Sequence, residues 1–199
     1  MTQMYYAENP DAAHDIHDLS VTLLGETFQF YTDAGVFSKK MIDYGSQVLL
    51  SCLDDVTSGQ TLLDVGCGYG PLGIALAKTQ GVVPTMIDVN SRAIGLAQKN
   101  AERNGVIATI YQSDLYAQVE GQFDAIISNP PIRAGKQVVH AIIEQAPTYL
   151  KTGGHLTIVI QKKQGAPSAK TKMAEVFENC EILKKDKGYY ILRSYYENS

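Results

Sequence analysis

The sequence predicts an α/β protein: a doubly wound, mostly parallel seven-stranded sheet that ends in an antiparallel hairpin. Two observations predict this fold. Short apolar runs alternate with helix-like segments from about residue 61 onward, and the last two runs are joined by the tight turn Asp186-Lys187-Gly188. Strands that alternate with helices lie parallel, and such sheets bind ligands beyond the carboxyl ends of their strands.

Seven apolar runs give the strands of this sheet. The first has the continuous apolar character of a buried strand, and the others follow at intervals that leave room for helices. The expected strands span residues 61–65, 82–89, 106–111, 123–128, 155–161, 181–185 and 189–196.

Helices are expected between the strands. Pro71 occupies the tolerated first turn of a helix at 71–79. Ser91 caps a helix that runs to about residue 103, where Asn104-Gly105 ends it. Further helices are expected at 136–150, ended by Gly153-Gly154, and at 169–178.

Residues 1–54 are expected to form a cap packed on the same domain. Residues 16–24 and 27–32 alternate in polarity around Gly25-Glu26 like a hairpin, and residues 38–53 have the pattern of a helix. Residues 55–199 then form the ligand-binding domain.

The composition is that of an ordinary soluble domain, with 45% hydrophobic and 19% charged residues in a chain of 199. Three cysteines without a Cys-x-x-Cys spacing and four scattered histidines indicate neither a disulfide framework nor a metal site. The N-terminus is not leader-like, and no apolar run approaches the ~20 residues of a membrane span. We therefore expect a cytoplasmic protein.

Charge is distributed unevenly along the chain. Residues 1–128 hold 6 Lys/Arg against 15 Asp/Glu, a balance of −9, whereas residues 129–199 hold 11 against 6, a balance of +5. The basic half could gather phosphates around a site near Asn129, although a solvated lysine face would give the same count.

A glycine-rich turn follows the first strand of the sheet and supports two interpretations. Read from Gly68, it matches the dinucleotide fingerprint Gly-x-Gly-x-x-Gly. Read from Asp64, it is Asp-x-Gly-x-Gly-x-Gly through Gly66, Gly68 and Gly70, where glycine lets the backbone approach a nucleoside ligand. A carboxylate would repel a pyrophosphate but attract the cationic amino group of a methionine moiety, which favours S-adenosylmethionine.

Two more acids follow the next two strands. Asp88 closes the second, where a carboxylate can accept hydrogen bonds from a ribose diol, and Asp114 follows the third, where it could meet an adenine amine. Either alone would more often be a turn or cap residue. Together, acids at three successive strand ends predict a cofactor pocket.

The motif Asn129-Pro130-Pro131-Ile132 follows the fourth strand. Its prolines remove two amide donors, so the Asn129 side-chain oxygen and the Pro130 carbonyl can both face outward as acceptors. Two acceptors that hold the hydrogens of a conjugated amine would orient its nitrogen toward a sulfonium methyl group. The motif therefore predicts N-methyl transfer with Asn129 and Pro130 catalytic, although a lone Asn-Pro turn would be read as purely structural.

With these motifs, the chain resembles class I S-adenosylmethionine-dependent methyltransferases, specifically the small-subunit ribosomal RNA guanine-N2 methyltransferases and their single-domain relatives. The segments that carry the resemblance are Gly35-Val36-Phe37-Ser38 with Ile42-Asp43-Tyr44-Gly45-Ser46, Asp88-Val89-Asn90-Ser91-Arg92-Ala93, Asn129-Pro130-Pro131-Ile132-Arg133-Ala134-Gly135-Lys136, and Gln161-Lys162-Lys163-Gln164-Gly165-Ala166. The resemblance implies a Rossmann-like methyltransferase fold, S-adenosyl-L-methionine as cofactor, and ribosomal RNA or a small-subunit particle as partner.

The motifs and the resemblance together assign two sets of site residues. The cofactor-binding set is Phe37, Ser38, Asp64, Gly66, Gly68, Gly70, Asp88, Asn90, Asp114 and Asn129. The substrate-binding set is Pro131, Ile132, Arg133 and Lys136, of which Arg133 and Lys136 are expected to contact phosphates.

Two departures from the family pattern bear on the substrate. Better-characterised guanine-N2 enzymes resemble two fused domains, one of which helps to bind RNA, whereas this chain has room for one. Adenine-N6 methyltransferases place an aromatic residue where Ile132 stands, to stack on a flipped base. Stacking is therefore expected from Phe37 or Tyr31, or the substrate is not adenine.

Several functions remain open at this point. Ribosomal RNA guanine is the leading substrate, and a protein glutamine amide or an adenine is the enzymatic alternative. A nicotinamide-dependent oxidoreductase would use the Gly68–Gly73 fingerprint but leaves Asn129-Pro130-Pro131 unexplained. A non-catalytic RNA-binding module is the third class.

Overall fold

The structure, a computed structural model, describes residues 15–33 and 42–197. Its strands are β1 (His17–Leu23), β2 (Glu26–Thr32), β3 (Thr61–Val65), β4 (Val83–Asp88), β5 (Thr109–Gln112), β6 (Phe123–Ser128), β7 (Leu150–Gln161), β8 (Glu181–Asp186) and β9 (Tyr189–Tyr195). Its helices are α1 (Tyr44–Leu50), α2 (Pro71–Gln80), α3 (Ser91–Arg103), α4 (Gly135–Gln145) and α5 (Ala166–Phe177). Short 3-10 helices are η1 (Ile132–Ala134), η2 (Ala146–Tyr149) and η3 (Lys162–Gln164).

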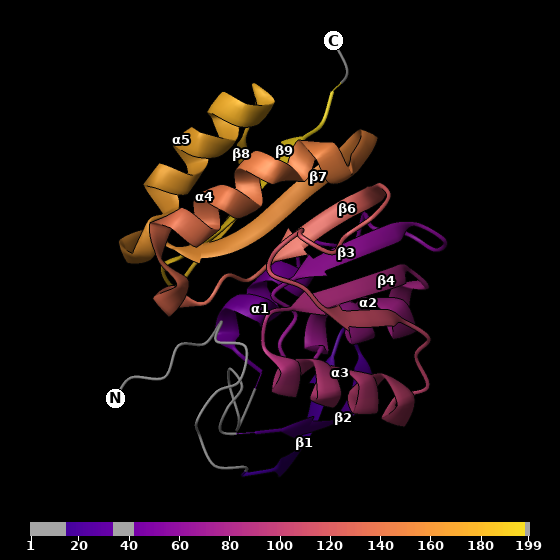
Figure 1. The fold of residues 1–199 in the computed structure, drawn as a ribbon. Coiled ribbons are helices and arrows are strands. Elements are labelled where there is room, and N and C mark those ends of the chain that lie inside the picture. The colour runs from indigo at the N-terminus through magenta and orange to yellow at the C-terminus, as the bar shows by residue number, and fades with distance from the viewer. Residues whose placement is uncertain (1–14, 34–41, 198–199) are drawn as a thin grey trace.

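One seven-stranded sheet organises the molecule, with strand order β5-β4-β3-β6-β7-β9-β8 (Figure 1). The first five strands of that order are mutually parallel, and β9 runs antiparallel between β7 and β8. The order reverses at β3, from which the chain first moves outward to β4 and β5 and then crosses back to β6. The predicted fold class is confirmed.

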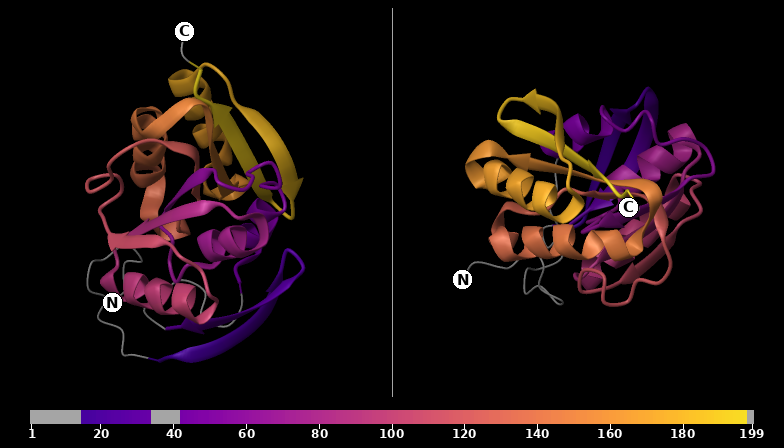
Figure 2. Two further views of the ribbon diagram at one scale, coloured as in Figure 1. Left: turned by 90° about the vertical axis from the view of Figure 1, so that its right-hand side faces the viewer. Right: turned by 90° about the horizontal axis from the view of Figure 1, so that it is seen from above.

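Helices cover both faces of the sheet, as Figure 2 shows from two further directions. Consecutive strand residues point to opposite faces, so Leu62 packs in the apolar cluster under α1, α2 and α3, while Leu63 packs in the cluster under α4 and α5. No helix among the described residues is both long and apolar enough to span a bilayer.

Some element boundaries differ from the prediction. Asn90, not Ser91, caps α3, because its side-chain oxygen accepts hydrogen bonds from the backbone N–H groups of Arg92 at 2.9 Å and Ala93 at 3.3 Å. The helix expected at 136–150 leaves α geometry after Gln145, where Pro147 supplies no N–H for the ladder. Gly153-Gly154 consequently lies inside β7 and does not end a helix.

The N-terminal part also differs in detail. The expected helix at 38–53 is described only as α1, which begins after Asp43; residues 38–41 lie outside the described part of the chain. The expected hairpin is present as β1 and β2. Asn100 of α3 fixes it, because its amide accepts from the Tyr31 N–H at 2.7 Å and donates to the Tyr31 carbonyl at 3.0 Å and to the Tyr69 carbonyl at 2.8 Å.

A buried cation joins the C-terminal hairpin to the rest of the domain. Arg193 of β9 is 2% exposed, and its guanidinium donates to the Thr157 hydroxyl at 2.8 Å, to the Cys52 carbonyl at 3.4 Å and to the Asp55 carboxylate. Burial, together with the nearby Arg193 charge, lowers the pKa of His155 to about 4. The Arg193 charge is therefore paired with a carboxylate and hydrogen-bonded to two further protein groups.

Candidate active site

The glycine-rich turn between β3 and α2 is built from residues in left-handed conformations. Gly66, Gly68 and Gly70 have φ values of 76°, 58° and 99°, which residues with a Cβ rarely adopt. A Cβ on Gly70 would also lie 2.9 Å from the Ile74 side chain. The turn is tied to β4, because the N–H groups of Gly66 and Cys67 both donate to the Ile87 carbonyl at 2.9 Å.

Asp88 at the end of β4 holds the turn from the other side. One of its carboxylate oxygens accepts from the Gly68 N–H at 2.9 Å and the other from the Asn90 N–H at 2.9 Å. A carboxylate offers about four acceptor positions, so the same group can also serve ribose hydroxyls. Asp88 is 3% exposed and lines the cavity described below.

Asp64 is the least satisfied buried group near the turn. Its side chain is fully buried, and among the described residues neither carboxylate oxygen has a partner at hydrogen-bond distance; the Gly73 backbone N–H, which lowers the pKa of the carboxyl, only partly opposes the effect of burial. Burial, reinforced by the negative charge of Asp88, raises the pKa of Asp64 to about 8. No Lys or Arg in the part of the chain that the structure describes forms an ion pair with it. The residue therefore suits a ligand that brings its own positive group, as the amino end of S-adenosylmethionine does.

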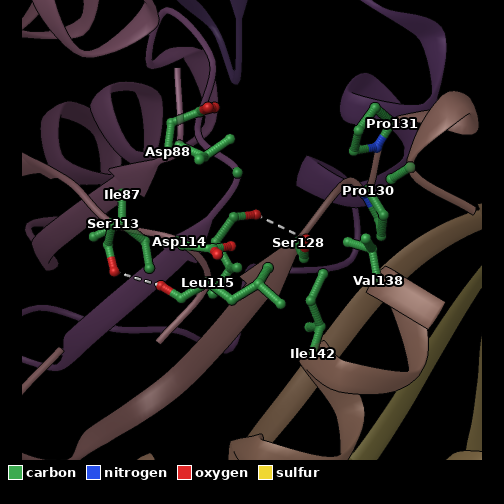
Figure 3. A pocket seen from close by; sticks show the side chains of 14 residues that line it. Ile87, Asp88, Ser113, Asp114, Leu115, Ser128, Pro130, Pro131, Val138 and Ile142 are labelled. Carbon is green, nitrogen blue, oxygen red and sulfur yellow. Dashed lines mark hydrogen bonds between the residues drawn. The ribbon is translucent and has the colours of Figure 1, made fainter. Parts of the chain in front are cut away.

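A cavity of about 210 Å³ opens at the carboxyl ends of β3, β4 and β6. Figure 3 shows Asp88 and Ser113 on one side of it and Pro130, Pro131 and Val138 on the other, with Ile142 of α4 lower down between them. Gly66 also lines the cavity, and a Cβ placed on it would meet no protein atom within 4 Å. The mainly apolar wall with a few acids matches a nucleoside that carries a ribose diol.

The Asn129 amide is held in one orientation. Its nitrogen donates to an Asp43 carboxylate oxygen at 2.7 Å and to the Ser46 hydroxyl at 2.8 Å. An ionised carboxylate only accepts hydrogen bonds, so the NH₂ group must face Asp43 and the amide oxygen must face away from it. The two partners come from the start of α1, where Asp43 also accepts from the Ser46 N–H at 3.2 Å.

A second, smaller hollow lies beside Asn129. Its volume is about 40 Å³, and its lining includes Asn129, Gln161 and Tyr189. Pro130 and Pro131 line both this hollow and the larger cavity. The two prolines therefore lie between a larger and a smaller compartment.

Most of the predicted cofactor residues lie near the cavity; some line it, and others are buried behind its wall. Gly66, Asp88 and Asp114 line the cavity, with Asp114 exposed at its mouth. Asp64, Gly68, Gly70 and Asn90 are buried residues that do not line it, and the Asn90 side chain is the cap of α3. Asn129 lines the smaller hollow, and Phe37 and Ser38 lie outside the described residues.

The predicted substrate residues are more scattered. Pro131 lines both compartments, whereas Arg133 and Lys136 are exposed near the start of α4 and line neither. The backbone of Ile132 belongs to η1, but its side chain lies outside what the structure describes. Tyr31, named as a possible stacking residue, does not line the hollow; the Arg103 guanidinium lies 4.1 Å from the centre of its ring.

Sequence reasoning missed several residues of the cavity wall. Val138 and Ile142 project into it from α4, and their i, i+4 spacing was the available signal. Leu115 also lines it, in a left-handed conformation with φ 50° that is unusual for a side chain of its size. The Ser113 hydroxyl, which donates to the Leu115 carbonyl at 2.7 Å, helps to hold that turn.

Comparison with known proteins decides between the cofactors that the glycine-rich turn allows. The model of the family described as Methyltransferase small domain matches residues 27–193. The chain belongs to this family. The uncharacterized protein YbxB of Bacillus subtilis (strain 168) is 47% identical to this chain over 198 residues. These residues are 98% of this chain and 98% of YbxB.

Enzymes of stated activity match part of their length. Ribosomal RNA small subunit methyltransferase C of Aeromonas hydrophila is 40% identical over 130 residues, which are 63% of this chain and 37% of that enzyme. The solved structure of T. thermophilus 16S rRNA N2 G1207 methyltransferase (RsmC), in complex with AdoMet and guanosine, has a TM-score of 0.83 at 26% identity and covers 90% of this chain and 50% of that one. This chain thus spans about half, or less, of the length of these two enzymes.

A more distant structure shares the fold. Ribosomal protein L11 methylase from Lactobacillus delbrueckii subsp. bulgaricus has a TM-score of 0.67 at 23% identity, covering 77% of this chain and 79% of that one. Taken together with the family match, the methyltransferase small domain described here is a class I S-adenosyl-L-methionine-dependent methyltransferase. The uncompensated Asp64 and the open space at Gly66 fit that cofactor.

Proposed function

We propose that this protein methylates the exocyclic N2 amine of a guanine in ribosomal RNA. The observation that carries the proposal is the fixed orientation of the Asn129 amide, whose nitrogen is occupied by Asp43 and Ser46. Its oxygen is left to accept a hydrogen bond from a substrate amine. The bound S-adenosyl-L-methionine supplies an electrophilic methyl group on sulfur.

The residues at the site position the substrate amine. The Asn129 amide oxygen and the Pro130 carbonyl accept the two hydrogens of the amine and aim the nitrogen lone pair away from the ring plane. A new nitrogen–carbon bond forms as the sulfur–methyl bond breaks, and the amine then loses one proton. That proton is acidic once the methyl group has arrived, so water can take it and no strong base is required.

Two relatives support RNA and guanine as the substrate class. The Aeromonas hydrophila relative is named a ribosomal RNA small subunit methyltransferase, and the T. thermophilus enzyme was solved with guanosine. The uneven charge also supports an RNA substrate, because 11 of the 17 Lys/Arg residues follow Asn129 in the sequence, where the balance is +5 against −9 for residues 1–128.

Labelled cofactor and RNA from a strain that lacks this protein test the proposal. Small-subunit particles and the naked RNA extracted from them are incubated with the enzyme, and the RNA is digested for nucleoside mass spectrometry. We expect N2-methylguanosine in one of the two preparations. Label confined to protein, or a methyl group on adenine or on another guanine atom, would contradict the proposal, as would unlabelled RNA in both preparations.

A further inference from the structure

Gln161 has a buried acceptor that nothing in the described chain satisfies. It is the last residue of β7, its side chain is partly buried, and its amide oxygen is buried without a hydrogen-bond partner. Leaving such an oxygen unpaired is unfavourable, and a ligand that donates to it removes the penalty. Gln161 lines the same small hollow as Asn129.

The sheet places these two amides at the same edge, at the ends of the neighbouring strands β6 and β7. β6 and β7 are parallel neighbours with Ser128 paired to Ile158, so β7 extends three residues farther, as far as Gln161, beyond the point where β6 gives way to Asn129. Pro130 and Pro131 form the boundary with the cofactor cavity. A planar group whose edge enters the hollow would therefore meet Asn129 at one position and Gln161 at another.

We propose that this hollow receives the edge of the substrate base and that Gln161 identifies the base as guanine by accepting its ring N1–H. The inference rests on the proposed function, because it takes the amine at Asn129 to be the guanine N2 group. In guanine the ring nitrogen N1, which carries a hydrogen, is bonded to the carbon that bears the N2 amine. Two acceptors on this edge can therefore bind the amine and the N1–H at the same time.

Other bases present a different edge to the same pair of acceptors. Adenine carries a lone pair, not a hydrogen, on the ring nitrogen next to its amine. That lone pair would face the Gln161 oxygen, and the buried oxygen would stay unpaired. A site that hydrogen-bonds one substrate group rejects analogues that lack it, because its own polar atom is then stranded.

Two neighbouring features fit a nucleotide in this position. Tyr189, which pairs with Gln161 across β7 and β9, lines the hollow and offers an aromatic surface of the kind on which bases stack. On the outer side, Gln161 also lines an open groove of about 500 Å³ together with Lys162, Lys163 and Lys187. Lysines there can contact the phosphates of a single strand.

A substrate analogue tests the contact directly. Two short RNAs are compared, one with guanosine at the methylated position and one with 2-aminopurine riboside, which keeps the 2-amine but carries a lone pair at N1. For the unaltered enzyme we expect kcat/KM to be roughly 5- to 100-fold lower on 2-aminopurine. In Gln161→Leu the guanosine rate should fall by a similar factor while the 2-aminopurine rate stays, so the ratio approaches one.

Controls separate this contact from folding and from the proposed function. Gln122→Leu alters an exposed glutamine just before β6, and it should keep the full preference for guanosine. Binding of S-adenosylhomocysteine should be equal in all three proteins. An unchanged preference in Gln161→Leu overturns the role of Gln161 and leaves the proposed function intact, whereas an unaltered enzyme that methylates guanosine in no RNA overturns both.

Discussion

Asp64 and Arg193 are both buried ionisable residues, yet the fold treats them in opposite ways. Arg193 donates to a carboxylate, a hydroxyl and a carbonyl, whereas both oxygens of Asp64 are unpaired. Arg193 connects β9 to the segment after α1, and Asp64 lies at the carboxyl end of β3 beside the cofactor cavity. The difference indicates that the Arg193 charge serves the fold, while the Asp64 carboxyl group is left for a ligand.

Gln161 resembles Asp64 in having a buried oxygen without a hydrogen-bond partner in the described chain. It too lies at a carboxyl strand end, and it lines a hollow. Unpaired buried groups are destabilising and uncommon in folded proteins. Asp64 and Gln161 both lie at carboxyl strand ends, next to the cavity and the hollow. Substitutions there and at Arg193 should therefore have separable effects on activity and stability.

The largest effect is expected from Asn129→Ala. Loss of a positioned acceptor should lower kcat by about 2–4 kcal/mol of transition-state stabilisation, roughly 30- to 1000-fold. Cofactor affinity and melting temperature should change little, because Asn129 serves the site and not the core. Single-turnover methylation and calorimetric titration measure the two quantities, and a variant with unaltered turnover would contradict the assigned role.

Asp55→Ala should lower the stability of the protein and leave its turnover unchanged, the reverse of the effect of Asn129→Ala. It leaves the buried Arg193 guanidinium without its carboxylate, which is expected to lower the free energy of unfolding by about 3 kcal/mol. Because the Asp55 side chain is 51% exposed, its own loss of packing is small. Urea unfolding measures the change, and turnover per folded molecule should stay the same. Asp54→Ala, an exposed neighbouring acid, is the matched control.

Asp64 should link cofactor binding to proton release. With its pKa near 8, the carboxyl is mostly protonated at pH 7 in the free protein, and a cationic amino group beside it would lower that pKa. Binding at pH 7 should then release close to one proton, and affinity should weaken as pH falls below 8. Calorimetry in two buffers of different ionisation enthalpy measures the release, and an equal release from Asp64→Asn would assign the proton to another group.

The same pKa has a consequence for the free protein. Because a pKa of about 8 lies above the ordinary aspartate value of ~3.9, the folded state binds the extra proton between these limits. This residue therefore makes the unliganded protein less stable as pH rises from about 4 to 8. Asp64→Asn should remove that slope, which comparison of urea midpoints at pH 6.5 and 8 detects.

The smallest effect is expected from Ser46→Ala. It removes one of the two acceptors of the Asn129 amide but keeps Asp43, so the amide is still oriented, with less restraint. A loss of about 1 kcal/mol in kcat, close to fivefold, with KM unchanged would fit a positioning role. Ser51→Ala at the end of the same helix should leave kcat unchanged. A change in KM alone would instead indicate a direct substrate contact.

The fold and the cofactor turn could be predicted because their signals are local. The run from Asp64 to Gly70 encodes its own backbone conformation, and the alternation of strands and helices fixes where it lies. Errors arose where neighbours competed, as at the cap of α3, where Asn90 outcompetes Ser91, and at Pro147, which ends α geometry inside an apparently continuous helix.

The arrangement around Asn129 could not be predicted in this way. Its partners Asp43 and Ser46 are 86 and 83 residues away along the chain. The motif alone indicated that the amide oxygen faces outward, but not which residues hold the NH₂ group on the other side. Gln161 was noted only as part of a family segment, because the unpaired state of its oxygen depends on every neighbour that fails to reach it.

Gly45 sets the spacing between the two sides of the hollow. An added Cβ at this position would lie 2.8 Å from the Tyr189 ring, so α1 rests on β9 without room for a methyl group. This contact fixes how far α1, which orients the Asn129 amide, lies from β9, the strand that pairs with Gln161. Any larger residue at position 45 would push α1 away from β9, and Asp43 and Ser46 would then no longer hold the Asn129 amide where Gln161 faces the same ligand.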